Sequence, residues 1–311
     1  MAFLKEHVPL KHLILNNNGL GPYAGVQIAD ALSELAEKKA LARKEGKEVP
    51  VLCTIICGRN RLESGSMTAW ARALSNHRGV KEIKMTQNGI RQDGIAVLLR
   101  EGLRGCEDLE VLDLQDNTFT LTGSLALSEV VGGWKQLREL GVGDCLLGAR
   151  GGVVVAEALS KGTNTGLRVL RAQYNELDAK GVKALFTASE IGLPELRRVE
   201  LNGNKFSEDD EGVEGLRILL NERKDEAGES HADAEWGLDD LSDLEEDSDE
   251  DKEDEAEESA EKDASDEETD LKPDIKAERI LQEADDAEEE TVPRKEDKDV
   301  DALAEQLEKK L

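Results

Sequence analysis

Short runs of apolar residues recur along the first two thirds of the chain at a nearly constant interval. The pattern L-x-x-L-x-L-x-x-N-x-L occurs seven times, if other apolar residues are allowed at the L positions and Cys is allowed for Asn. The copies start near residues 10, 52, 80, 109, 137, 167 and 196. A period this regular is typical of a protein built from stacked structural repeats.

Each copy predicts a strand, a turn and a helix. The apolar residues at offsets 3 and 5 point to the same side of a short strand, because side chains alternate along it. After the turn the spacing becomes helical, as in Ile28, Ala29, Leu32 and Leu35 of the first copy,. Stacked units of this kind place a parallel sheet inside and helices outside. We therefore predict an α/β fold, a leucine-rich-repeat solenoid in the form of a ribonuclease-inhibitor-like horseshoe.

The polar residue at offset 8 has a predicted structural role. Its side chain can satisfy backbone groups of the turn that would otherwise be buried without a partner. We call these positions the ladder, and they are Asn18, Asn60, Asn88, Asn117, Cys145, Asn175 and Asn204.

The predicted repeat domain covers residues 1–224. Its first repeat is longer than the others, and the charged residues 38–50 predict an extended or looped-out end of the first helix, solvated rather than used for binding. Residues 207–224 predict a terminal helix that covers the last repeat, whereas nothing comparable precedes the first strand,.

The two parts of the chain differ in charge. Of 69 acidic and 40 basic residues, 39 and 10 lie in residues 225–311, so residues 1–224 are neutral and the net charge of −29 belongs to the C-terminal part. Such a segment buries too little apolar surface to fold, which predicts an acidic disordered tail over 225–311. A short helix is predicted at 299–311, where apolar residues return at helical spacing.

The composition argues against several classes of protein. An acidic balance disfavours direct binding to nucleic acid. No run of about 18 apolar residues occurs, so we expect no membrane span. Four cysteines and four histidines form no metal-ligand spacing and no nucleophile–base pattern,. We expect a soluble intracellular protein with no metal site, no cofactor and no active site of its own.

The two positions before each ladder residue are mostly polar and vary from copy to copy. They are Asn16 and Asn17 in the first copy and Gly58 and Arg59 in the second. Because the fold asks only for polarity there, such a row along one edge predicts a protein-binding surface. A merely solvated edge is the alternative.

Several strings go beyond the general repeat pattern. LILNNNGLGPYAG, IICGRNRLESGSM, VLDLQDNTFT, LRELGVGDCLLGARG and ELNGNKFSEDD resemble the Ran GTPase-activating proteins, most closely the fungal ones. The resemblance extends over residues 3–224, and the acidic tail also matches the family's layout. It implies activation in trans of the small GTPase Ran in its GTP form, alone or together with a Ran-binding protein.

The resemblance also implies site residues. In this family an asparagine helps to orient the GTPase's own catalytic glutamine, and no arginine finger is inserted. The asparagine is the first of the string N-N-G-L-G-P, which begins here at Asn17. For Arg61, a salt bridge along the edge is an equal alternative to partner contact. The predicted partner contacts are Asn16, Arg59, Arg61, Asp116 and Asp144. The family's N-terminal repeats have no counterpart before Met1, so we expect this chain to lack them.

Two other functions fit parts of the pattern. Leucine-rich acidic proteins that chaperone histones or act as scaffolds share the repeat body and the acidic tail. Their repeats are about 23 residues long, whereas those of this chain, after the first, are 28–30 residues long. A ribonuclease inhibitor has repeats of this length but is rich in cysteine. From the resemblance we expect a monomeric cytoplasmic protein of nucleocytoplasmic transport, located also at the nuclear envelope or shuttling to the nucleus.

Overall fold

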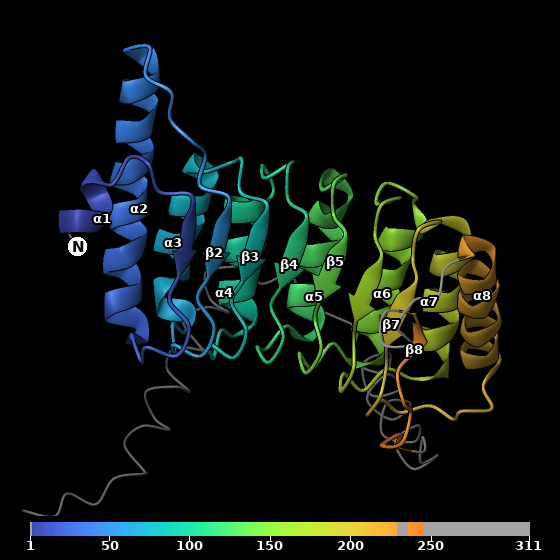
Figure 1. Ribbon diagram of the computed structural model, residues 1–311. Coiled ribbons are helices and arrows are strands. Elements are labelled where there is room, and N and C mark those ends of the chain that lie inside the picture. Colours follow the sequence, from blue (N-terminus) through green and yellow to red (C-terminus); the bar gives the residue numbers. More distant parts are fainter. Residues whose placement is uncertain (1, 229–235, 246–311) are drawn as a thin grey trace, which may run out of the picture. The chain divides into compact units, whose positions relative to one another are not determined.

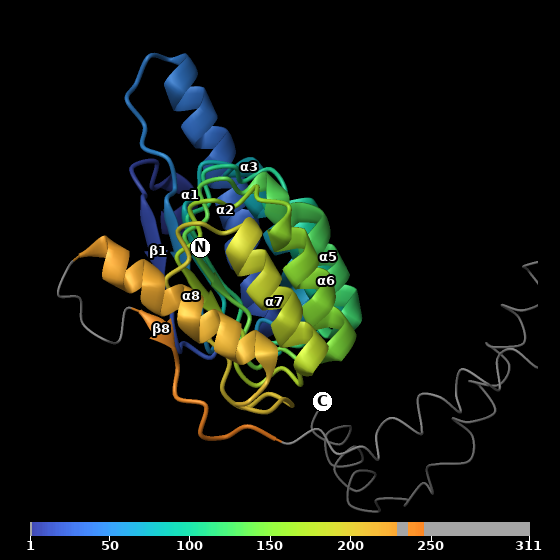
Figure 2. The same cartoon turned by 90° about the vertical axis from the view of Figure 1, so that its right-hand side faces the viewer.

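A computed structural model describes residues 2–228 and 236–245 of the chain, all within one compact unit, Met1–Ser248. In this unit strands and helices alternate along the chain. They form two layers, a sheet and the helices that cover one of its faces (Figures 1 and 2). The predicted α/β leucine-rich-repeat solenoid is confirmed.

The sheet consists of parallel strands that follow one another in sequence order. The central residue of each of the first seven strands lies opposite its neighbour, and these apolar residues are all buried. The register therefore reproduces the spacing of the sequence pattern. The strands are β1 (His12–Ile14), β2 (Thr54–Ile56), β3 (Glu82–Lys84), β4 (Val111–Asp113), β5 (Glu139–Gly141), β6 (Val169–Arg171), β7 (Arg198–Glu200) and β8 (Gly237–Leu238).

The helices pack side by side against the sheet, and no helix in the described ranges is long and apolar enough to cross a bilayer. They are α1 (Ala2–Glu6), α2 (Gly21–Lys44), α3 (Met67–Asn76), α4 (Gln92–Val97), α5 (Thr120–Val130), α6 (Gly148–Ser160), α7 (Ala179–Ile191) and α8 (Glu211–Ala227). Short helical turns complete this layer, namely the 3₁₀ turns η1 (Ser64–Ser66) and η3 (Val131–Gly133) and the π-helical turn η2 (Leu98–Leu103).

One continuous apolar core lies between the two layers. The predicted face of the first helix, Ile28, Ala29, Leu32 and Leu35, is buried in it. Each repeat buries its apolar face against its neighbours and could not do so alone, which is why the core runs the length of the stack.

The long first repeat forms the predicted extended helix end, and Lys39 within it departs from the prediction. Helix α2 continues to Lys44 and residues 43–48 are exposed, as an extended, solvated helix end requires, but Lys39 is only 2% exposed. The Lys39 Nζ donates hydrogen bonds of 2.7–2.8 Å to the carbonyl oxygens of Val8, Leu10 and Pro50. Burial lowers the pKa of this ammonium to about 8,. The insertion thus ties the start of the chain to the segment before β2.

The folded body also extends beyond the predicted boundary at residue 224. Helix α8 ends at Ala227, and β8 pairs with β7. Leu241 is buried, and the carboxylate of Asp239 accepts hydrogen bonds from two backbone N–H groups of the loop after β7. The acidic composition predicts disorder here, whereas the side chain of Asp239 is part of the folded structure. The helix predicted at 299–311 lies outside the described residues.

Candidate functional site

A row of side chains follows the strands along one edge of the sheet, at offset 7 of each repeat. Each residue has a left-handed backbone, with φ between 51° and 57°, and each is exposed. We call this set the loop row, and it comprises Asn17, Arg59, Gln87, Asp116, Asp144 and Tyr174. Gly203 occupies the corresponding position of the seventh repeat, with φ of 70°.

The left-handed conformation follows from the way the loops stack. The backbone N–H of Asn17 donates to the carbonyl oxygen of Gly58 at 2.9 Å, and that of Arg59 donates to Thr86 at the same distance. The same bond recurs from repeat to repeat up to Tyr174, whose N–H donates to the carbonyl of Asn202. The fold therefore fixes the backbone and turns each side chain outward.

Only half of the residues in the loop row are of types that a left-handed backbone prefers. A left-handed conformation suits Gly, Asn and Asp, and it costs other residues about 1–2 kcal/mol each. Asn17, Asp116 and Asp144 fit this preference. Arg59, Gln87 and Tyr174 do not fit it, so the backbone conformation does not explain why these residue types occur there. Strain of this kind is common where the side chain has a function.

The three consecutive asparagines have three different environments. The Oδ1 atom of Asn16 accepts a hydrogen bond from the backbone N–H of Gly58 at 2.7 Å, so this side chain helps to hold the next loop. The side chain of Asn17 is exposed and has no hydrogen bond within the described residues. The Nδ2 atom of Asn18 donates to the carbonyl oxygen of Asn16 at 3.1 Å. The carboxamide of Asn17 is therefore available to another molecule.

The internal ladder residues join neighbouring repeats. The Nδ2 atom of Asn88 donates to the carbonyl of Cys57 in the preceding repeat at 2.9 Å, and its Oδ1 accepts from the backbone N–H groups of Asn60 and Leu62. Equivalent bonds to the preceding repeat start from the side chains of Asn60, Asn117, Cys145, Asn175 and Asn204.

Asn18 lies at the ladder position but differs from the prediction made for it. Its backbone N–H donates to Oδ1 of Asn60 at 2.8 Å, as in the other repeats. Its side chain is exposed and bonds only to its own loop. In the described residues β1 pairs with β2 alone, so the amide of Asn18 has no carbonyl of a preceding strand to bind.

Charges of both signs occur in the loop row. Burial raises the pKa of the Asp116 carboxyl, the nearby Asp144 carboxylate raises it further, and the Arg59 guanidinium opposes both,. These three groups are thus close enough to influence one another. A partner meets a surface that is basic at the second repeat and acidic at the fourth and fifth.

Arg61 lies beside the loop row. Its Nη2 atom is 3.8 Å from Oε1 of Glu63, which supports an ion pair along the edge. Its side chain is also 85% exposed, which leaves it available for contact with a partner. Arg61, Glu63 and Arg91 line part of a hollow of about 530 Å³ next to the row. The hollow offers guanidinium groups to an acidic group of a partner.

Two exposed apolar side chains come from the segment that carries Asn17. Ile14 on β1 is 64% exposed, and Tyr23 in the first turn of α2 is 77% exposed. Sequence analysis did not single out Tyr23, although an aromatic residue at a helix start, off the apolar face, is a usable signal. Exposed apolar side chains of this kind are available for contact with a partner.

The described residues contain no cluster of His, Cys, Asp or Glu that could hold a metal ion. His77 is buried beneath α2, where its Nε2–H donates to the carbonyl of Leu32 at 2.8 Å. What the site offers is therefore a set of outward-facing polar groups on a fixed backbone, which suits recognition of another protein.

Comparison with known proteins gives a consistent result for the sequence. No family model matches the chain. It is 44% identical over 219 residues to Ran GTPase-activating protein 1 of Saccharomyces cerevisiae, which covers 69% of this chain and 53% of that protein. It is 32% identical over 214 residues to the Ran GTPase-activating protein of Drosophila melanogaster, covering 68% of this chain and 34% of that one. The chain thus spans about half the length of the yeast relative and about a third of the length of the Drosophila one.

A search of solved structures gives a more distant likeness. A protein from Bacteroides fragilis matches with a TM-score of 0.40 and 17% sequence identity, over 78% of this chain and 68% of that one.

Proposed function

We propose that this chain, a relative of the Ran GTPase-activating proteins, stimulates GTP hydrolysis by a small GTPase of the Ran type in its GTP-bound form. It would act in trans, by contributing groups to the nucleotide site of the GTPase. The observation that carries this proposal is the environment of Asn17, whose side chain is exposed and unbonded while its backbone is fixed by the neighbouring loop.

The proposed role of Asn17 is to orient the catalytic glutamine of the GTPase, which in turn positions the attacking water. A carboxamide suits this task because it both donates and accepts hydrogen bonds and adds no charge. The backbone of Asn17 is held in position by the hydrogen bond from its N–H to the carbonyl oxygen of Gly58. Positioning of this kind, rather than covalent chemistry, is what phosphoryl transfer requires of the protein.

One amide cannot supply all of the acceleration. Activating proteins of small GTPases raise the rate by up to about 10⁵-fold, which corresponds to about 7 kcal/mol. We propose that the remainder comes from excluding water and fixing the GTPase's mobile loops. The exposed side chains of Ile14 and Tyr23, three residues before and six residues after Asn17 in the sequence, are candidates for covering such a site,.

The other partner contacts are proposed along the loop row. Arg59 and Arg61 face an acidic surface of the GTPase, and Asp116 and Asp144 face a basic one. Such complementary charges speed association and set the orientation of the bound partner more than they raise affinity. Asn16 contributes less directly, since its Oδ1 is bonded to Gly58. A Ran-binding protein could join the complex, and the activator itself acts as a monomer in the cytoplasm.

The proposal is tested by single-turnover GTP hydrolysis. Purified chain is added to Ran loaded with radiolabelled GTP, and phosphate release is followed with and without the chain. We expect stimulation that saturates with the concentration of the chain. A parallel pull-down with core histones tests the alternative of an acidic histone chaperone. Histone binding without any stimulation of hydrolysis would reject the proposed function.

A further inference from the structure

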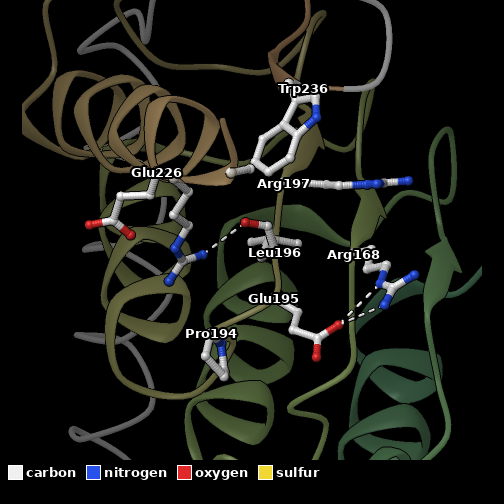
Figure 3. Close-up of a pocket in the computed structure, with 9 residues that line it drawn as sticks. Arg168, Pro194, Glu195, Leu196, Arg197, Glu226 and Trp236 are labelled. Carbon is white, nitrogen blue, oxygen red and sulfur yellow. Dashed lines mark hydrogen bonds and ion pairs between the residues drawn. The ribbon is translucent and has the colours of Figure 1, made fainter. Parts of the chain in front are cut away.

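The first residues of the predicted tail form a strap on the repeat domain. We use this name for residues 236–245. At its start, the Trp236 ring lies over Arg197, with 5.9 Å between the guanidinium carbon and the ring centroid. Figure 3 shows this pair beside a cavity of about 500 Å³ that Arg168 and Glu195 also line. The strap then pairs with β7 through β8.

The strap next contacts one residue of the loop row, Tyr174, and the nearby Asn202. The carboxylate of Asp243 accepts hydrogen bonds from the hydroxyl of Tyr174 at 2.9 Å and from Nδ2 of Asn202 at 3.2 Å. The backbone N–H of Asp243 donates to Oδ1 of Asn202 at 2.8 Å. Asp239 accepts from the backbone N–H groups of Leu201 and Asn202. The strap is thus docked by specific bonds onto the sixth and seventh repeats.

Ser242 is exposed in the turn of the strap, between the buried Leu241 and the docked Asp243. Its hydroxyl has no hydrogen bond within the described residues. Acidic residues follow it at positions 243, 245, 246 and 247. A serine kinase with a basic substrate groove is complementary to such a sequence. We infer that Ser242 is a phosphorylation site for a kinase of this acid-directed class, and that its phosphorylation releases the strap from the loop row.

The modification is an ordinary phosphoryl transfer. The Oγ atom of Ser242 forms a bond to the γ-phosphorus of ATP while the bond from that phosphorus to the bridging oxygen of ADP breaks. ADP leaves with the bonding electron pair, and the hydroxyl proton passes to the kinase's base. The product carries about −1.5 to −2 additional charge at pH 7.

The added charge opposes docking because of what surrounds it. Asp239, Asp240, Asp243 and Glu245 all lie within three residues of Ser242. The groups that hold the two docked carboxylates are uncharged: a phenol, a carboxamide and backbone N–H groups. They cannot offset an additional dianion, and a phosphate next to carboxylates disrupts structure by like-charge repulsion. Release would free the hydroxyl of Tyr174 and the carboxamide of Asn202 from their bonds to Asp243.

The experiment uses the full chain with casein kinase 2 and ATP as the probe. Mass spectrometry locates the phosphate, and hydrogen exchange reports the docking of the strap, because the N–H groups of Gly237, Asp239 and Glu245 are bonded to the repeat body. Ser242→Ala removes the proposed site. Ser248→Ala is the matched control, since it removes a serine in an equally acidic sequence outside the described residues.

We expect phosphate on Ser242 in the wild-type chain and in Ser248→Ala. Exchange in residues 236–245 should become roughly tenfold faster in these two samples, with no change in Ser242→Ala. Exchange around Asn88 should stay slow throughout. The inference is overturned if Ser242 stays unmodified in the wild-type chain and in Ser248→Ala, whether or not another serine is phosphorylated. It is equally overturned if phosphate on Ser242 leaves exchange of the strap unchanged or slower, or speeds exchange in the whole body. None of these readouts depends on the GTPase.

Discussion

Gly58 holds the loop that carries Asn17 from two directions. Its carbonyl oxygen accepts the backbone N–H of Asn17 at 2.9 Å, and its own N–H donates to the side chain of Asn16 at 2.7 Å. A side chain at residue 58 would not fit, because a Cβ there would lie 2.7 Å from Oγ1 of Thr86. The glycine thus allows the close stacking that fixes Asn17 in place.

The first prediction separates the side chain of Asn17 from its backbone. With φ at 56°, glycine replaces it without strain, whereas alanine adds a cost of about 1 kcal/mol,. We expect Asn17→Gly to lower stimulated GTP hydrolysis by about 10²-fold, as loss of one preorganised polar group does elsewhere. The melting temperature should stay unchanged. Single-turnover kinetics and thermal unfolding measure the two effects.

The matched control for that change is Gln87→Gly. It makes the same kind of backbone change at the same position of the loop row, with φ of 53°. We expect it to leave the stimulated rate at a saturating concentration of the chain within about threefold of wild type, since Gln87 belongs to the loop row but is not proposed to act at the nucleotide site. Equal losses from both variants, or full activity of Asn17→Gly, would show that the carboxamide is not the group that matters.

The second prediction compares two ladder residues. Asn88→Ala leaves two backbone N–H groups and the carbonyl of Cys57 without their buried partner, so we expect a loss of about 2–4 kcal/mol of unfolding free energy,. Asn18→Ala removes only a bond to its own exposed loop and should cost under about 0.5 kcal/mol,. Urea unfolding measures both. A large loss at Asn18 would mean that its amide has a partner that the described residues do not supply.

The sequence predicts the repetitive part of this fold well and its ends poorly. The register of β1 to β7 follows from the spacing of apolar residues, because every internal repeat has the same neighbours. At the ends the neighbours differ. No strand precedes β1 in the described part of the chain, so the side chain of Asn18 bonds to its own loop. Lys39 is buried against carbonyls of residues far apart in the chain. Asp239 looks like part of a solvated acidic run until its backbone partners are seen.

The site shows the same division. Spacing places Asn17 and Arg59 on one edge, and the structure has both there, exposed and left-handed. The spacing of residues cannot show that the side chain of Asn16 bonds to Gly58 or that the hydroxyl of Tyr174 donates to Asp243. Those contacts depend on side-chain positions and, for Asp243, on a segment that no repeat pattern includes.

The third prediction concerns pH. Burial lowers the pKa of His77 below its ordinary value of 6.5, and the nearby Lys39 and Arg43 add to this, although the bond to Leu32 acts in the opposite direction. Below pH 6.5 the unfolded chain therefore binds a proton that the folded chain does not. We expect the stability that this group contributes to be complete above pH 6.5 and to fall as the pH drops below it.

The measurement is urea unfolding at several values between pH 7 and pH 5. The wild-type stability should fall with pH in this window, and His77→Gln should fall less steeply although it is less stable at pH 7. His12→Gln is the control, because His12 is exposed on β1 and should keep the wild-type slope. If His77→Gln keeps the full slope, the imidazole is not the group responsible.

The fourth prediction uses the thiols. Burial raises the pKa of Cys57 and Cys106 to about 11 and that of Cys145 to about 12, whereas Cys53 is partly exposed. Only the thiolate reacts with a disulfide reagent, and at pH 8 a thiol of pKa 12 is ionised about once in 10⁴ molecules. We expect Ellman's reagent to modify one thiol of the native chain quickly and all four after denaturation. Cys53→Ser should leave no fast thiol, since the other three side chains are sealed between strands and helices. Any fast thiol in that variant would mean that the repeats open locally far more often than so continuous a core allows,.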